Sequence, residues 1–171
     1  MHSAIDHFCG AGCHIRDGNN TRTYCGDGNP GCYGQVHADG EVIMGAMWKV
    51  RERMRAELQR GGSDQFDLKQ GAGGIADIEF MVQYAVLRWA HEYPDLLEFS
   101  DNIRLLDGLE RHRLLAAEEA GSLRDAYRAF RASYHRNALQ ELPGLVAGRR
   151  HADERARVRE LWQRLMHAPA G

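Results

Sequence analysis

Apolar residues recur every three or four positions along most of the chain beyond position 46, as they do on one side of an amphipathic helix. Glycine and proline interrupt this pattern at Gly61-Gly62, Pro94 and Pro143-Gly144. The pattern predicts five helices, over residues 47–58, 75 to about 92, 103–109, 118 to about 140, and 153–166. The fold class that follows is all-α, a helical bundle of about five helices.

The stretch between the first two predicted helices is rich in glycine. Alternating apolar and polar residues over 66–69 predict a short extended piece. Residues 71–74, three of them glycine, then turn the chain. The helix that begins at Ile75 is the most apolar of the five and is too long for a single strand, so we expect it to be largely buried.

Single residues in the last three predicted helices indicate where one helix begins and which sides of the other two are buried. Ser100-Asp101-Asn102 is typical of a helix N-cap ahead of Ile103. The helix over 118–140 is predicted to present an inner side made of Leu123, Tyr127, Phe130, Tyr134 and Leu139. The final helix has its apolar residues at Val158, Leu161, Trp162 and Leu165.

The first 45 residues differ from the rest of the chain in composition. They show no sustained helical or strand period and contain too few large apolar residues to offset the entropy of ordering them. We therefore expect an irregular, poorly ordered leader, rich in glycine and cysteine, over 1–45, and a helical domain over 46–171. A zinc site is the weaker alternative, because the cysteine spacings do not form two tight pairs. Its ligands would be Cys9, Cys13, Cys25 and Cys32.

Charge and hydropathy exclude several function classes. The chain has 22 lysines and arginines against 24 acidic residues, a formal net charge of −2, and so lacks the basic field of a nucleic-acid-binding protein. No apolar run approaches the roughly 20 residues that cross a bilayer, and the first residues do not resemble a secretory signal. We therefore expect a cytoplasmic protein with neither nucleic acid nor membrane as a partner. Lys69 is notable because all the other lysine and arginine positions, except Lys49, are arginine.

Candidate chemistry is concentrated between Gly61 and Gln83. The run Gly71-Ala72-Gly73-Gly74-Ile75-Ala76 fits the G-x-G-x-x-A pattern of dinucleotide-binding proteins. That kind of site requires a second parallel strand after the helix, and the sequence predicts none. Dinucleotide binding is therefore excluded.

A second pattern is that of metal-dependent nucleotidyl transferases. In such enzymes a Gly-Ser pair precedes two acids that hold the ions bridging a nucleotide's phosphates. Gly62-Ser63 followed by Asp77 and Glu79 imitates this pattern. On a strand the two carboxylates would share one side, but on a helix they lie roughly 200° apart. Because the segment is predicted to be helical, we expect that the two acids do not bind a common metal ion.

A third interpretation is an anion site at the start of that helix. The N–H groups of Gly73, Gly74 and Ile75, together with the helix dipole, can hold a phosphate, and Lys69 can add a positive charge. The alternative is a tight glycine turn whose nearby acids cap the helix N-terminus. The local sequence leaves both interpretations open.

Glu79 and Gln83 form a polar row, four residues apart, on this otherwise apolar helix. Polar side chains on a buried helix need partners within the fold or in a neighbouring domain. Arg104, just inside the next predicted helix, is one candidate partner.

Three consecutive stretches of sequence carry a family resemblance. FDLKQGAGGIADIEFMVQYAVLRWA, YPDLLEFSDNIRLLDGL and ERARVRELWQRLM strongly resemble the C-terminal end of glutamine synthetase adenylyltransferase, and the resemblance covers about residues 46–168. That bifunctional enzyme adds AMP to a tyrosine of glutamine synthetase and removes it. The form of the first stretch resembles the second, adenylylating half.

The resemblance implies a chain that matches the helical part of such an enzyme. In that family the metal-binding acids lie upstream, in a nucleotidyltransferase domain, so this chain looks like a truncated member without turnover of its own. Mg²⁺ and ATP are implied for the full-length family, and neither is expected to bind tightly here. Glutamine synthetase is the implied partner, and a PII-type signal protein a further one. A non-catalytic helical module that docks on one of these, or on a separately encoded catalytic domain, is the alternative. The candidates at the edge of the nucleotide cleft are Lys69, Gly73, Gly74, Asp77, Glu79, Gln83 and Arg104.

Overall fold

The computed structural model describes the backbone of residues 36–167 and the side chains of 45–166. The chain forms two compact units, and the second, Val50–Ala168, contains the site considered below. Helix α2 covers Val36–Leu58, so that its residues from Val50 onward belong to this second unit. The helix begins well before the predicted boundary at 46. Gly40 and Gly45 break the apolar period of this stretch, yet a helix tolerates each glycine at a cost of about 1 kcal/mol.

The other elements of the second unit follow in the order expected from the sequence, with two additions, η1 and β2. In chain order these elements are β1 (Gln65–Asp67), α3 (Ile75–Trp89), the 3₁₀ turn η1 (Pro94–Leu97), α4 (Asn102–Arg111), α5 (Ala117–Leu139), β2 (Leu145–Ala147) and α6 (Ala152–His167). The described part of the chain is therefore mostly helical, with five α-helices, which confirms the predicted fold class.

The added strand, β2, pairs antiparallel with β1 so that Phe66 lies opposite Val146. The sequence predicts the extended piece at β1, but β2 is three residues long and has no apolar period to reveal it. The short ribbon nevertheless anchors the start of the turn that leads from β1 to α3. Leu68 donates its N–H to the carbonyl of Gly144 at 2.9 Å, directly beside the ribbon.

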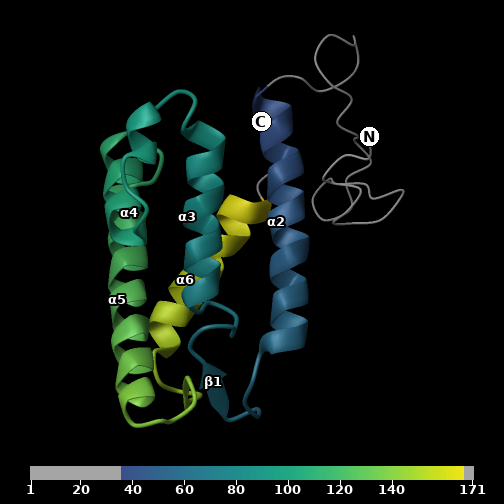
Figure 1. Cartoon of the computed structure of the whole chain (residues 1–171), viewed down its shortest axis with the longest axis vertical. Helices are drawn as coiled ribbons and strands as arrows, with labels where there is room; N and C mark the ends of the chain where they lie inside the picture. Colours follow the sequence, from purple (N-terminus) through teal and green to yellow (C-terminus); the bar gives the residue numbers. More distant parts are fainter. Residues whose placement is uncertain (1–35, 168–171) are drawn as a thin grey trace. The chain divides into compact units, whose positions relative to one another are not determined.

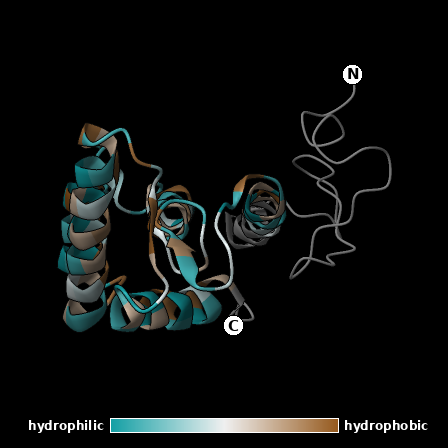
Figure 2. Cartoon of the chain, turned by 90° about the horizontal axis from the view of Figure 1, so that it is seen from below, coloured by the Kyte–Doolittle hydropathy of each residue, from teal (hydrophilic) through white to brown (hydrophobic). Residues whose placement is uncertain are grey.

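Four helices enclose the core. In Figure 1, α3, α4 and α5 run side by side, and α6 (yellow) crosses α3 and α5 obliquely. The coloured helices of Figure 2 each carry hydrophobic and hydrophilic residues, as expected of helices with one buried side. Each of the four helices contributes fully buried apolar side chains, among them Ile78, Leu106, Leu109, Leu123, Phe130 and Leu161.

Two predictions about single positions have different outcomes. Asp101 is the N-cap of α4, and its carboxylate accepts the N–H of Arg104 at 3.0 Å, which confirms the predicted cap. The prediction that Leu139 lies on the inner side of α5 is wrong, because its side chain is 87% exposed. Asn137 faces the fold instead, donating to the carbonyls of Pro143 and Leu145 at 2.9 Å. Leu139, two residues later, is rotated about 200° away from it.

An exposed ion cluster joins η1 to the end of α4. Nε2 of His112 lies 2.9 and 2.8 Å from the two carboxylate oxygens of Asp95, and Arg111 lies 3.3 Å from one of them. The ring of Tyr93 stacks on His112 at 4.4 Å between centroids. The hydrogen bond from His112 is the main reason that the pKa of Asp95 lies below its ordinary value of 3.8.

The lowered pKa predicts how Asp95→Asn changes the pH dependence of stability. A carboxylate with a depressed folded-state pKa stabilises the protein above its unfolded-state pKa, and this contribution is lost as the pH falls through the folded-state value. The variant should therefore melt below the natural chain near pH 5, with the difference shrinking below pH 3.8. Melting temperatures across this pH range test the prediction, with Asp125→Asn, at an exposed position of α5, as the matched control. An unchanged difference at low pH would contradict this assignment.

Candidate functional site

The turn between β1 and α3 is built around the side chain of Asp67. Its Oδ1 accepts the N–H groups of Lys69 and Gln70, both at 2.9 Å, and its Oδ2 accepts that of Arg60 at 3.0 Å. Aspartate side chains commonly bond the backbone two and three residues ahead in this way, and this stabilises a turn. Only glycine fits at position 71 of this turn, because a Cβ there would lie 2.5 Å from the carbonyl oxygen of Asp67.

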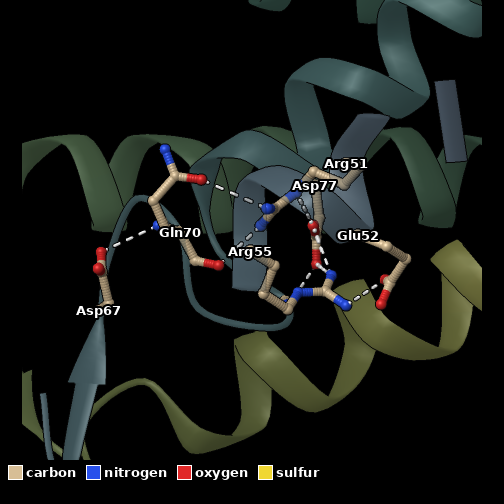
Figure 3. A network of polar contacts seen from close by, with 7 residues as sticks. Arg51, Glu52, Arg55, Asp67, Gln70 and Asp77 are labelled. Atoms are coloured by element: carbon tan, nitrogen blue, oxygen red, sulfur yellow. Dashed lines mark hydrogen bonds and ion pairs between the residues drawn. The ribbon is translucent and has the colours of Figure 1, made fainter. Parts of the chain in front are cut away.

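Asp77, in the first turn of α3, is the centre of a buried ion cluster (Figure 3). It accepts Arg51 Nε at 2.6 Å and Arg55 Nη2 at 3.0 and 3.1 Å, one distance to each carboxylate oxygen. Its Oδ2 also accepts the N–H of Gly73 at 2.7 Å. The residue is 1% exposed. Donors from α2 and from the glycine turn thus occupy both carboxylate oxygens.

Arg51 connects this cluster to the turn. Its side chain is fully buried and donates to the backbone carbonyl of Gln70 at 2.8 Å and to the Gln70 amide oxygen at 3.3 Å. Burial lowers the pKa of Arg51, and the adjacent Asp77 carboxylate opposes this change. Arginine nevertheless stays protonated in proteins, so the buried positive charge depends on Asp77 for its neutralisation. The cluster therefore holds the turn against α2 and has no spare acceptor for a ligand.

Glu79 faces a different part of the fold. The hydroxyl of Tyr127 on α5 donates to Glu79 Oε1 at 3.1 Å, and Nδ2 of Asn102 donates to the same hydroxyl at 3.1 Å. Burial is the main reason that the pKa of Tyr127 is raised. Asp77 thus points to α2 and Glu79 to α5, as expected for a helix, and the two carboxylates share no site.

No group of three or more metal-ligating side chains occurs among the residues with a described structure. The cysteines of the zinc alternative, Cys9, Cys13, Cys25 and Cys32, lie outside them. Within the same part of the chain, no helix is long and apolar enough to cross a membrane.

The three backbone donors of the predicted anion site are each used within the fold. Gly73 donates to Asp77 Oδ2, Gly74 to the carbonyl of Gly71 at 2.9 Å, and Ile75 to that of Leu68 at 2.9 Å. A phosphate would have to displace these acceptors. The geometry therefore favours a glycine turn held by Asp77 over the anion site, although no acidic side chain of the described residues bonds the N-cap residue Gly74 itself.

The remaining candidates do not gather at one place. Lys69 is exposed and lines a cavity beside the turn, and Gln83 is exposed on α3. Arg104 forms an ion pair with Asp101 and lies over the ring of Phe99 at 4.2 Å. The suggestion that Arg104 pairs with Glu79 is therefore wrong. The first-turn arginine of α4 is held by its own N-cap carboxylate.

Sequence reasoning missed Arg51, Arg55 and Gln70. The available signal was Asp77 itself, an acid in the most apolar predicted helix, which needs a cationic partner if that helix is buried. Arg51 and Arg55 lie four positions apart on the preceding helix and so share one side of it.

Comparison with known proteins finds one matching family model and several similar proteins. The family model described as GlnD PII-uridylyltransferase matches residues 47–165. Relatives named "bifunctional glutamine synthetase adenylyltransferase/adenylyl-removing enzyme" include one from Nitrosococcus oceani, 51% identical over 117 residues, and one from Pseudomonas aeruginosa, 57% identical over 100 residues. A third, from Pseudomonas putida, is 52% identical over 139 residues. The matches cover 68%, 58% and 74% of this chain but span 12%, 10% and 14% of those relatives.

Proposed function

This chain belongs to the family described as GlnD PII-uridylyltransferase, and from that premise we propose that it is a non-catalytic helical part of a glutamine synthetase adenylyltransferase. The proposed partner is glutamine synthetase, and the proposed role is in the control of nitrogen assimilation. Its glycine-turn motif suggests the adenylylating half of the bifunctional relatives. The observation that carries the proposal is the internal use of Asp77.

Transfer of AMP from ATP to a tyrosine hydroxyl requires divalent cations that neutralise the developing phosphoryl charge. Carboxylates with free oxygens must hold those cations. Asp77 gives both oxygens to Arg51, Arg55 and Gly73, and Glu79 bonds Tyr127. We therefore infer that Asp77 and Glu79 serve the fold, and that the metal-binding acids of the reaction belong to another domain. Mg²⁺ and ATP then bind the complete enzyme rather than this chain.

The turn has a separate proposed role at the edge of a nucleotide cleft. Asp67, Gly73 and Asp77 hold it by hydrogen bonds, and Lys69 extends from it with an exposed side chain. A lysine presented in this way can add a point charge to a phosphate bound by a neighbouring domain. In this proposal Lys69 contacts the nucleotide, and the buried residues position it.

The test is transfer of labelled AMP from ATP to glutamine synthetase in the presence of Mg²⁺. The complete Pseudomonas aeruginosa relative is the positive control. The purified chain should give no transfer above the rate without protein, because Asp77 and Glu79 bond different elements of the fold and do not hold a metal ion together. Transfer by the purified chain that depends on Mg²⁺ would contradict the proposal.

The interaction-module alternative predicts a different readout. It requires that the chain bind glutamine synthetase, a PII-type protein or a catalytic domain without any nucleotide. Exposed apolar side chains at Leu58, Leu139 and Leu142 favour some docking role. Binding without ATP and Mg²⁺, measured by calorimetry, would support it.

A further inference from the structure

A cavity of about 370 Å³ lies beside the turn that follows β1, and its lining includes Gln70 but not Arg51, Arg55 or Asp77. Its walls come from the end of α2, the turn after β1, the last turns of α5 and the loop before β2. The apolar part of the lining consists of Leu58, Tyr134, Ala138, Leu142, Pro143 and Leu145. Its volume falls within the range of natural ligand sites, about 300–1,000 Å³.

The walls of this cavity are fixed by contacts within the fold. Asn137 donates to the carbonyls of Pro143 and Leu145 at 2.9 Å and so holds the loop that forms one wall. Gly144 lies against the ring of Tyr134, where an added Cβ would come within 2.6 Å of Cε2. A site held in this way loses little conformational entropy when it is occupied.

The polar part of the lining carries a net positive charge. Arg60 and Lys69 are exposed there, and no carboxylate of the described residues forms an ion pair with either. Asp67 is the one acid in the lining, and its oxygens are directed to the backbone N–H groups of Arg60, Lys69 and Gln70. Two exposed cations beside one internally bonded carboxylate favour an anionic occupant.

The apolar surface extends beyond the cavity. Leu58 is 49% exposed and Leu142 53% exposed at the cavity itself, and Leu139, next to the lining residue Ala138, is 87% exposed. A small anion would leave these side chains in water. A peptide with one large apolar side chain between carboxylates would cover the leucines and place negative charge beside Arg60 and Lys69.

We propose that this cavity is a docking site for an acidic segment of a partner protein that carries a large apolar side chain between carboxylates. The apolar anchor lies over Leu58, Tyr134 and Leu142, and the flanking carboxylates pair with Arg60 and Lys69. The site shares Lys69 with the proposed nucleotide cleft and Gln70 with the Asp77 cluster. Peptide binding measured without ATP or Mg²⁺ tests it separately from the adenylylation chemistry proposed above.

The experiment uses the full chain and three synthetic peptides. The first has two glutamates on each side of a Leu-Phe pair, the second replaces the glutamates by glutamine, and the third replaces the Leu-Phe pair by alanine. Fluorescence anisotropy should show binding of the first peptide that is at least about tenfold tighter than that of either control peptide. Its affinity should also fall as salt is raised.

Chain variants locate the binding. The double charge reversal Arg60→Glu/Lys69→Glu should weaken the first peptide by at least about tenfold, since two favourable charge contacts become repulsive. Arg113→Glu/Arg136→Glu, at exposed positions outside the lining, is the matched control and should bind like the natural chain. Leu142→Ala should weaken binding without changing its salt dependence.

Several results would overturn the proposal. These are equal binding of the acidic and glutamine peptides, equal loss in both charge-reversed variants, or no binding at peptide concentrations of about 1 mM. NMR shifts at Lys69 and Leu142 produced equally by inorganic phosphate would indicate an anion site instead. Self-association of the natural chain that is lost in Arg60→Glu/Lys69→Glu would make a second copy the occupant.

Discussion

Asp77→Ala should lower the free energy of unfolding by about 3–5 kcal/mol, because it leaves the buried charge of Arg51 without a partner. Arg51 is fully buried and has Asp77 as its carboxylate partner at 2.6 Å. The change also removes the acceptor for the N–H of Gly73 and two hydrogen bonds from Arg55. Chemical denaturation at neutral pH, analysed with a common m-value, measures the loss.

Glu79→Ala is the matched control on the same helix. Glu79 is half-buried and accepts a hydrogen bond from Tyr127, so its removal should cost only about 1 kcal/mol. The comparison also separates the structural role of Asp77 from a metal-binding role. A carboxylate kept for an absent metal ion is commonly destabilising, so its replacement would leave stability unchanged or raise it. That outcome for Asp77→Ala would contradict the role assigned to the cluster.

Gly73→Ala should have the second-largest effect, a loss of roughly 2–4 kcal/mol. The backbone of Gly73 has a φ of 80°, a conformation that side chains with a Cβ rarely adopt. A Cβ there would lie 2.5 Å from the backbone carbonyl oxygen of Arg155 on α6. Because the obstacle is backbone, relief requires α6 or the turn to move. The same denaturation measurement detects this loss.

Gly121→Ala is the control for that substitution. Gly121 lies within α5, and the nearest atom to an added Cβ is the end of the Arg124 side chain, 4.0 Å away. Alanine is favoured over glycine in a helix, so this variant should be more stable by up to about 1 kcal/mol. If Gly73→Ala left the free energy of unfolding unchanged or raised it, as Gly121→Ala is expected to do, the turn would not be held as described.

Helix α3 shows what the sequence predicts well. Its apolar content and the glycines before it predict a buried helix from Ile75, and the structure starts α3 at that residue. Its end at Trp89 comes earlier than the predicted Glu92, because the chain turns before Pro94. The inner side of α5 is predicted correctly at Leu123 and Phe130, but its last turn lies beyond the core. Apolar spacing cannot indicate where a neighbouring helix stops covering a side.

The buried cluster could not be assigned from the sequence in the same way. Arg51 and Asp77 are 26 positions apart, and their pairing depends on how α2 packs on the glycine turn. Arginine supplies all but two of the 22 basic residues, so no feature of composition distinguishes Arg51 and Arg55 from the arginines of exposed surfaces. Helical geometry did predict that Asp77 and Glu79 face different ways, because that follows from two positions and one period.

The most direct measurement is a double-mutant cycle between Arg51 and Asp77, using Arg51→Met, Asp77→Ala and the double variant in the full chain. If Asp77 exists to neutralise Arg51, the double variant should be more stable than the sum of the single losses predicts, by about 1–3 kcal/mol. Additive losses, within about 0.5 kcal/mol, would contradict the assignment of Asp77 to the fold and reopen its assignment to a metal ion.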